Sequence, residues 1–167
     1  MVDEGRRGIF ASLSSALKGE KRESQPHTVR PPYNSDPDLF HRLCPECADK
    51  PCAGVCEEEI IEIDEEGTPV LSFSKRGCTF CDACLDACEP GVLSDKTLNS
   101  INAVVEIDVL KCMAWHQSIC SSCKDPCLED AIAFLGLFRP QIVSDRCTGC
   151  GWCIHVCPSD AINVVSS

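Results

Sequence analysis

The feature that most restricts this chain is its sixteen cysteines among 167 residues. They fall into four groups of four along the sequence, and no cysteine is left over. Group one is Cys44, Cys47, Cys52 and Cys56; group two is Cys78, Cys81, Cys84 and Cys88; group three is Cys112, Cys120, Cys123 and Cys127; group four is Cys147, Cys150, Cys153 and Cys157. Such a repeat indicates a chain built from related units, each organised around its own cysteines.

A comparable cysteine content occurs in small secreted proteins that are held together by disulfides. Those proteins need an export signal, and this N-terminus offers a poor one. Arg6 and Arg7 weakly resemble a twin-arginine signal, but residues 9–17 contain three serines and no small-residue cleavage site follows. Without export the compartment is reducing, and clustered thiols there are typically metal ligands. The sequence therefore predicts metal binding rather than disulfides.

The spacing within groups two and four specifies the kind of metal centre. Both groups have the form C-x2-C-x2-C-x3-C, and Pro158 follows the last cysteine of group four. In bacterial ferredoxins with this spacing, the first three thiolates bind one [4Fe-4S] cluster and the fourth ligates the neighbouring cluster. Structural zinc sites use pairs of cysteines separated by longer stretches. We therefore predict that all sixteen cysteines are iron ligands and that four [4Fe-4S] clusters are bound.

Groups one and three depart from this spacing. Group one is C-x2-C-x4-C-x3-C, with Pro51 in the longer gap, and group three is C-x7-C-x2-C-x3-C. Longer loops can still close on a cluster because loop entropy grows slowly with length. They predict a different exposure and reduction potential for these two clusters. An empty or labile site in one of these groups, which leaves three clusters, stays open as an alternative.

Crossed ligation requires the groups to act in pairs. In a sequential pairing, Cys56 reaches cluster two, Cys88 reaches cluster one, Cys127 reaches cluster four and Cys157 reaches cluster three. A nested pairing, with group one beside group four and group two beside group three, remains open. Predicted hairpins between groups one and two and between groups three and four favour the sequential pairing.

The rest of the chain suggests an α+β fold with two ferredoxin-like halves. Residues 1–43 are polar and proline-containing, and we expect a mobile N-terminal arm with a short helix at 9–17. Hairpins are predicted from 62–64 with 70–73 and from 132–134 with 141–143, and a single strand is predicted at 103–108. With a boundary near residue 100, the halves span 44–99 and 100–167, each with small antiparallel sheets and short helices.

Several functions are disfavoured by composition. The formal charge of −11 argues against nucleic-acid binding, because phosphates would repel the chain. No apolar run approaches the roughly 18 residues of a membrane span. No phosphate-binding glycine loop and no nucleophile with a base at a recognised spacing is present. We therefore expect an electron-transfer or accessory protein without a catalytic site of its own.

Several motifs resemble the NapF family, the ferredoxin-type proteins of periplasmic nitrate reductase systems. The motifs that carry the resemblance are Arg6-Arg7-Gly8-Ile9, Arg30-Pro31-Pro32, Cys78-Thr79-Phe80-Cys81, Gln117-Ser118, Phe138-Arg139-Pro140-Gln141 and Cys147-Thr148-Gly149-Cys150-Gly151. They cover nearly the whole chain. Two features differ from the family pattern: group one has four residues between Cys47 and Cys52 instead of two, and Glu89 separates Cys88 from Pro90.

The resemblance implies a cytoplasmic protein. Its implied partner is the molybdenum-containing catalytic subunit of nitrate reductase, on which it would act before export, in maturation. Electron donation to a redox enzyme stays open as an alternative, and the redox donor is unidentified. A third alternative, a structural interaction protein, requires only that the bound metal be zinc.

Overall fold

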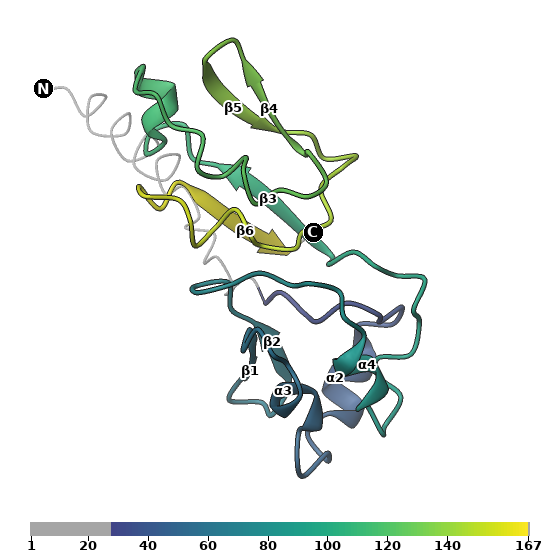
Figure 1. Cartoon of the computed structure of the whole chain (residues 1–167). Helices are drawn as coiled ribbons and strands as arrows, with labels where there is room; N and C mark the ends of the chain where they lie inside the picture. The colour runs from purple at the N-terminus through teal and green to yellow at the C-terminus, as the bar shows by residue number, and fades with distance from the viewer. Residues whose placement is uncertain (1–27, 167) are drawn as a thin grey trace, which may run out of the picture.

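The computed structural model describes residues 28–166, so the helix expected at 9–17 lies outside the described residues. The elements are, in order, α2 (Asp38–Leu43), α3 (Pro51–Gly54), β1 (Ile61–Ile63), β2 (Pro69–Leu71), α4 (Ala83–Asp86), β3 (Ala103–Ile107), the 3-10 helix η1 (Met113–His116), β4 (Ile132–Leu135), β5 (Phe138–Ile142) and β6 (Ile162–Ser166). Elements α2 to α4 with β1 and β2 form one lobe, and β3 to β6 form the other (Figure 1). Short helices and small sheets agree with the predicted α+β class.

Each sheet in this part of the chain is an antiparallel pair of strands. Strand β1 pairs with β2 and β4 pairs with β5, close to the positions at which the sequence predicts hairpins. Gly67 and Gly136 have φ of 75° and 71° in the two turns, a conformation that glycine adopts without steric cost. Strand β3, also predicted, pairs along its length with β6. This last sheet joins the beginning of the second lobe to its end.

Residues 28–43 correct the prediction of a mobile arm that extends to residue 43. Val29, Tyr33 and Phe40 are buried in the same apolar cluster as residues of the first lobe. The carbonyl of Val29 accepts a hydrogen bond from the backbone N–H of Leu71, and that of Tyr33 accepts from Ser94. The N-terminal sequence is polar on average, so its composition does not reveal these few apolar side chains. They are nevertheless enough to anchor the segment to the first lobe. The first lobe therefore begins before the first cysteine.

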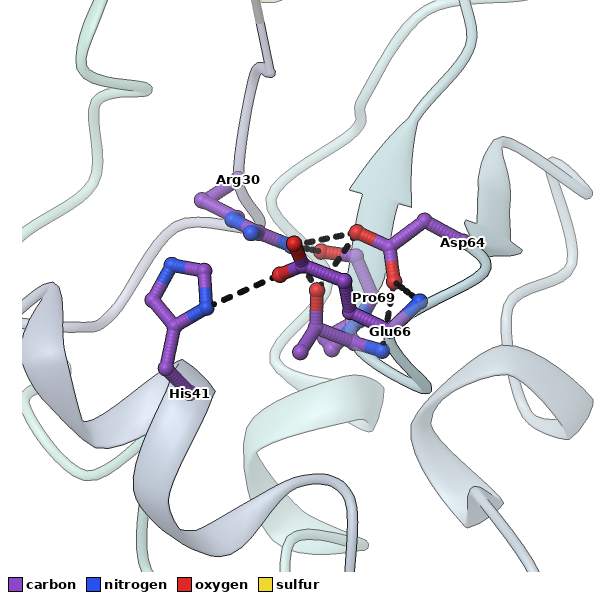
Figure 2. Close-up of polar contacts among 6 residues, drawn as sticks. Arg30, His41, Asp64, Glu66 and Pro69 are labelled. Carbon is purple, nitrogen blue, oxygen red and sulfur yellow. Dashed lines mark hydrogen bonds and ion pairs between the residues drawn. The ribbon is translucent and has the colours of Figure 1, made fainter.

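A polar cluster fixes this segment to the turn between β1 and β2 (Figure 2). The guanidinium of Arg30 donates to the carbonyl of Pro69 at 2.9 Å, to the hydroxyl of Thr68 and to Oδ2 of Asp64 at 3.4 Å. The fully buried Thr68 donates its N–H and hydroxyl to Asp64 at 2.8 and 2.6 Å. Partial burial of Asp64 tends to raise the pKa of its carboxyl group. The hydrogen bonds from Thr68 and the positive charge of Arg30 have a larger combined effect, so the pKa is lowered. The carboxylate is therefore charged at neutral pH.

Replacing Arg30 by alanine should lower the unfolding free energy by about 1–3 kcal/mol, because charged, partly buried hydrogen bonds are lost. The lowered pKa of Asp64 stabilises the fold above the ordinary pKa of a carboxyl group, and this stabilisation is lost as the pH falls. The unfolding free energy should therefore be measured at neutral pH. Anaerobic thermal unfolding followed by circular dichroism measures it. Arg76→Ala is the control, since its 3.3 Å pair with Glu58 is more exposed and should contribute less than about 1 kcal/mol. Equal shifts in the two variants would contradict this role of Arg30.

The halves also share apolar contacts. Ile154, from group four, packs against the cluster of the first lobe as well as against that of the second.

Among residues 28–166, no helix is both long enough and apolar enough to cross a membrane.

Candidate metal centres

Four cysteines line a largely apolar cavity in the first lobe. They are Cys56, which follows α3, and Cys78, Cys81 and Cys84 of group two; Cys84 lies in α4. The walls also include Tyr33, from the N-terminal segment, and Phe80. We refer to these four cysteines as set two. The fourth cysteine of group one thus lies with the first three of group two.

The remaining cysteines of the first lobe form set one: Cys44, Cys47, Cys52 and Cys88. Cys44 follows the end of α2, and Cys52 lies in α3. Burial raises the pKa of the Cys44 thiol, and ionisation of Cys52, Cys88 or Cys47 would raise that pKa further, so these side chains are neighbours. The longer gap of group one is absorbed by a turn in which Lys50 has φ of 44°, its ammonium donates to the carbonyl of Cys44, and Pro51 begins α3. The spacing that departs from the family therefore still brings Cys52 to the other cysteines.

The second lobe repeats the arrangement. A second cavity is lined by Cys112, Cys120, Cys123 and Cys157, which we call set three. Within the seven-residue gap of group three, η1 packs on β5, and the indole N–H of Trp115 donates to the carbonyl of Pro140 at 3.2 Å. The gap is thus a folded insertion attached to the hairpin.

Set four consists of Cys127, Cys147, Cys150 and Cys153. Burial raises the pKa of the Cys147 and Cys153 thiols, and nearby cysteines add to this effect. These neighbours are Cys150 and Cys127 for Cys147, and Cys150, Cys147, Cys123 and Cys127 for Cys153. The last cysteine of each group therefore lies near the first three of its sequence neighbour, and sequential pairing stays a prediction. Iron ligation by the sixteen individual sulfurs stays a prediction.

The thiols resist ionisation in the absence of a metal. Burial, with the charges of neighbouring cysteines added to it, raises the pKa of Cys44, Cys78 and Cys123 to about 11, and of Cys84 and Cys153 to about 12. A metal centre must therefore displace protons from these sites, and its positive charge replaces the repulsion between adjacent thiolates with attraction.

Backbone amides point at several sulfurs. The N–H of Phe80 donates to Cys78 at 3.4 Å, and the N–H groups of Leu93, Ala131 and Ala161 donate to Cys88, Cys127 and Cys157 at 3.3 Å each. Amide hydrogen bonds to cluster sulfurs raise the reduction potential by stabilising added negative charge. Two apolar cavities, each lined by four sulfurs, together with these donors, fit [4Fe-4S] clusters. No three His, Cys, Asp or Glu side chains in the described part of the chain are arranged to hold a single metal ion.

Comparison with known proteins identifies the family. The chain is 32% identical over 165 residues to the ferredoxin-type protein NapF of Escherichia coli strain K12, covering 96% of this chain and 94% of that protein. It belongs to the NapF family of ferredoxin-type proteins. NapF of Haemophilus influenzae is also 32% identical, over 95% of this chain and 89% of that protein. The resemblance predicted from the sequence motifs is confirmed.

Further similarities agree with this membership. Residues 140–163, which include group four, match the 4Fe-4S binding domain family. The methylamine utilization ferredoxin-type protein MauM of Methylorubrum extorquens is 29% identical, over 89% of this chain and 74% of that protein. The predicted cofactor is thereby confirmed: this NapF-family chain is an iron–sulfur protein that binds [4Fe-4S] clusters. When bound, such clusters store and release single electrons.

Some contributors to the centres were not predicted. Tyr33 lines the set two cavity from outside the cysteine groups, and its burial and the nearby Asp82 raise the pKa of its hydroxyl above the ordinary value. Gly77 and Trp152 bring group two against group four. The Gly before Cys78 was the one available signal, because glycine commonly marks a close backbone approach.

Proposed function

We propose that this NapF-family chain is a cytoplasmic accessory protein that acts in maturation of the molybdenum-containing catalytic subunit of periplasmic nitrate reductase before export. The observation that carries the proposal is the similarity to NapF over 96% of the chain, which extends beyond the cysteine groups into the N-terminal sequence. Generic cluster binding would require similarity only around the cysteines. Shared sequence outside them supports a shared partner.

We further propose two tandem ferredoxin-like halves that hold up to four clusters, with all sixteen cysteines as ligands. The four sets described above support it, since each combines three cysteines of one group with the last of its neighbour. The chain's own residues hold the clusters, keep water away with side chains such as Phe80, and direct amides at the sulfurs. In this proposal the chain has no substrate-transforming active site. Both described cavities are instead lined by cysteine sets.

The distribution of exposed apolar side chains supports binding to another protein. Among the described residues, Val55 and Ile63 are the large exposed hydrophobic side chains of the first lobe, and the second lobe has eight: Val104, Val109, Leu110, Met113, Ile119, Leu128, Leu135 and Leu137. Leu110 and Ile119, on either side of η1, are 81% and 88% exposed. Apolar side chains gathered in one region of a surface commonly mark an interaction site. The net charge of −11 would favour a cationic face on the partner.

Deleting residues 1–25 should leave iron content and reducibility unchanged but weaken capture of the immature catalytic subunit from cytoplasmic extract. The reason is that Arg6, Arg7 and the apolar residues of 9–17 precede the part that packs into the first lobe, which starts at Val29. Affinity capture with anaerobically prepared protein, with the subunit quantified by immunoblot, measures the effect. The matched variant Leu110→Ser with Ile119→Ser tests the exposed surface of the second lobe in the same assay.

Two results would count against the proposal. Equal capture by truncated and full-length protein would remove the N-terminal segment as a docking site. Equal capture of immature and mature, exported subunit would remove maturation. The second candidate, an electron-transfer protein for a redox enzyme, would then account better for the ferredoxin-type character of the family. Zinc bound without acid-labile sulfide would support instead the third candidate, a structural interaction protein.

A further inference from the structure

The two lobes meet at the loops that carry Cys78 and Cys150. The backbone N–H of Cys78, in set two, donates to the carbonyl of Cys150, in set four, at 2.7 Å. The carbonyl of Cys78 accepts a hydrogen bond from the indole N–H of Trp152 at 3.1 Å. Both hydrogen-bonding backbone groups of one cysteine are therefore held by the cysteine loop of the other lobe.

Glycines make this approach close. A Cβ atom on Gly77 would lie 2.6 Å from ring atoms and the backbone nitrogen of Trp152. A Cβ on Gly151 would lie 2.3 Å from the ring of Phe73, which belongs to the first lobe. Real Cβ contacts essentially never reach these distances, so any side chain at either position would force the two loops apart. The absence of a side chain at Gly77 and Gly151 therefore lets each backbone approach an aromatic residue of the other lobe closely.

We propose that this contact, which we call the junction, is the route by which the two lobes exchange electrons. With clusters bound, Cys56, Cys78, Cys81 and Cys84 would hold the centre on one side of the junction. Cys127, Cys147, Cys150 and Cys153 would hold the centre on the other side, and one electron given up by either centre would be taken up by the other. No covalent bond forms or breaks, and no proton is transferred. The electron enters the protein from an external low-potential one-electron donor. The Cys78–Cys150 hydrogen bond links two sulfur-bearing residues directly, and electrons tunnel more readily through such a bonded path than across an equal gap.

The junction fixes the order of the centres as one, two, four, three. Group two is followed in the sequence by group three, yet the backbone N–H of Cys78 donates to the carbonyl of Cys150 of group four. The cavity of set three is instead lined only by residues of the second lobe. Sets two and four are therefore the inner pair. Sets one and three occupy the ends.

This order gives a reason for the irregular spacings. Groups one and three supply three cysteines each to the terminal sets, and these are the groups with the longer gaps. The gap of group three contains η1 and the exposed Ile119. The regular groups two and four supply the inner sets. Irregular loops thus belong to the terminal sets, while the regular motif supplies the sets where the halves meet.

Gly77→Ala tests the junction, with Gly54→Ala as the matched control because a Cβ there meets no atom within 4 Å. After reduction with dithionite, electron paramagnetic resonance reports the magnetic coupling between neighbouring reduced clusters. Pulse radiolysis with methyl viologen radical measures how fast a single electron redistributes. In Gly77→Ala, iron and sulfide content and coupling within each half should be retained, coupling between the halves should be lost, and redistribution should slow several-fold. Gly54→Ala should match the unaltered protein.

Trp152→Phe is the second variant and decides the matter if Gly77→Ala loses iron. It keeps an aromatic ring but removes the hydrogen bond to Cys78, so a smaller slowing is expected. Normal coupling and redistribution in Trp152→Phe, in an iron-replete protein, would overturn the proposal. Two further variants empty one set each: Cys112→Ala empties set three, and Cys147→Ala empties set four. The proposal would also be overturned if the magnetic coupling of the set two cluster to the other half were lost in Cys112→Ala but retained in Cys147→Ala.

Discussion

Replacing Cys88 by alanine is expected to remove or destabilise the cluster bound by Cys44, Cys47 and Cys52 and to spare the cluster of its own group. The reason is that Cys88 lies with set one, close enough to Cys44 and Cys52 that its ionisation would raise the pKa of both thiols. If all four sites fill, the protein should lose about a quarter of its iron and sulfide. Anaerobic analysis of iron and acid-labile sulfide measures the loss of cluster. Electron paramagnetic resonance spectra of the reduced protein show which cluster is affected.

Cys56→Ala is the matched control for this experiment. It also replaces the last cysteine of a group, but its side chain lines the cavity of set two. Its effect should therefore fall on the cluster of Cys78, Cys81 and Cys84. If each variant damaged the cluster of its own group, crossed ligation would be wrong. If the protein without substitutions contained only three clusters, the result would indicate an empty site in set one or set three.

Removing the clusters is expected to unfold most of the chain. Two of the five buried residues in the main cluster of the second lobe, Cys123 and Cys153, are themselves cysteines, so little apolar core remains without the metal. Cores of domains this small rarely supply more than about 3–5 kcal/mol. Structural metal sites contribute on the order of 10 kcal/mol. Far-ultraviolet circular dichroism and limited proteolysis should report loss of structure in both lobes after anaerobic chelation of iron.

The same sample provides the control. A mock incubation without chelator should retain its spectrum and its resistance to protease. Adding iron, sulfide and a thiol reductant to the unfolded chain should restore both, because cluster binding and folding are one event. A chelated protein that keeps its far-ultraviolet spectrum and its protease resistance would contradict the prediction and show that the apolar clusters are sufficient.

Short-range sequence patterns predicted much of the fold and site. The cysteine groups, the two hairpins and the strand at 103–108 follow from spacing and alternation over a few residues, and local sterics largely decide such features. Crossed ligation stays a prediction, based on a C-x3-C interval that carries its final thiol one helical turn away from the other three. The structure arranges Cys56 and Cys157 accordingly.

Features that depend on long-range packing could not be predicted. Val29 and Tyr33 lie in a polar stretch, and only the shape of the first lobe shows that it has space for them. The junction joins Cys78 to Trp152, 74 positions further along the chain, and no periodicity connects the two. In each case a few side chains decide how a segment packs, whereas composition describes only the average of that segment.

The pairing of β3 with β6 has a consequence for synthesis on the ribosome. The first lobe contains all eight cysteines of sets one and two by Cys88, and its closing backbone contacts with Tyr33 are complete at Leu98. The second lobe is different, because Val105 cannot pair until Val164 has emerged. Domains generally fold as units in the order in which they are translated. The first lobe can therefore accept iron and sulfide while the second is still being made, and a ribosome stalled beyond the first lobe would carry a nascent chain with half of its centres filled.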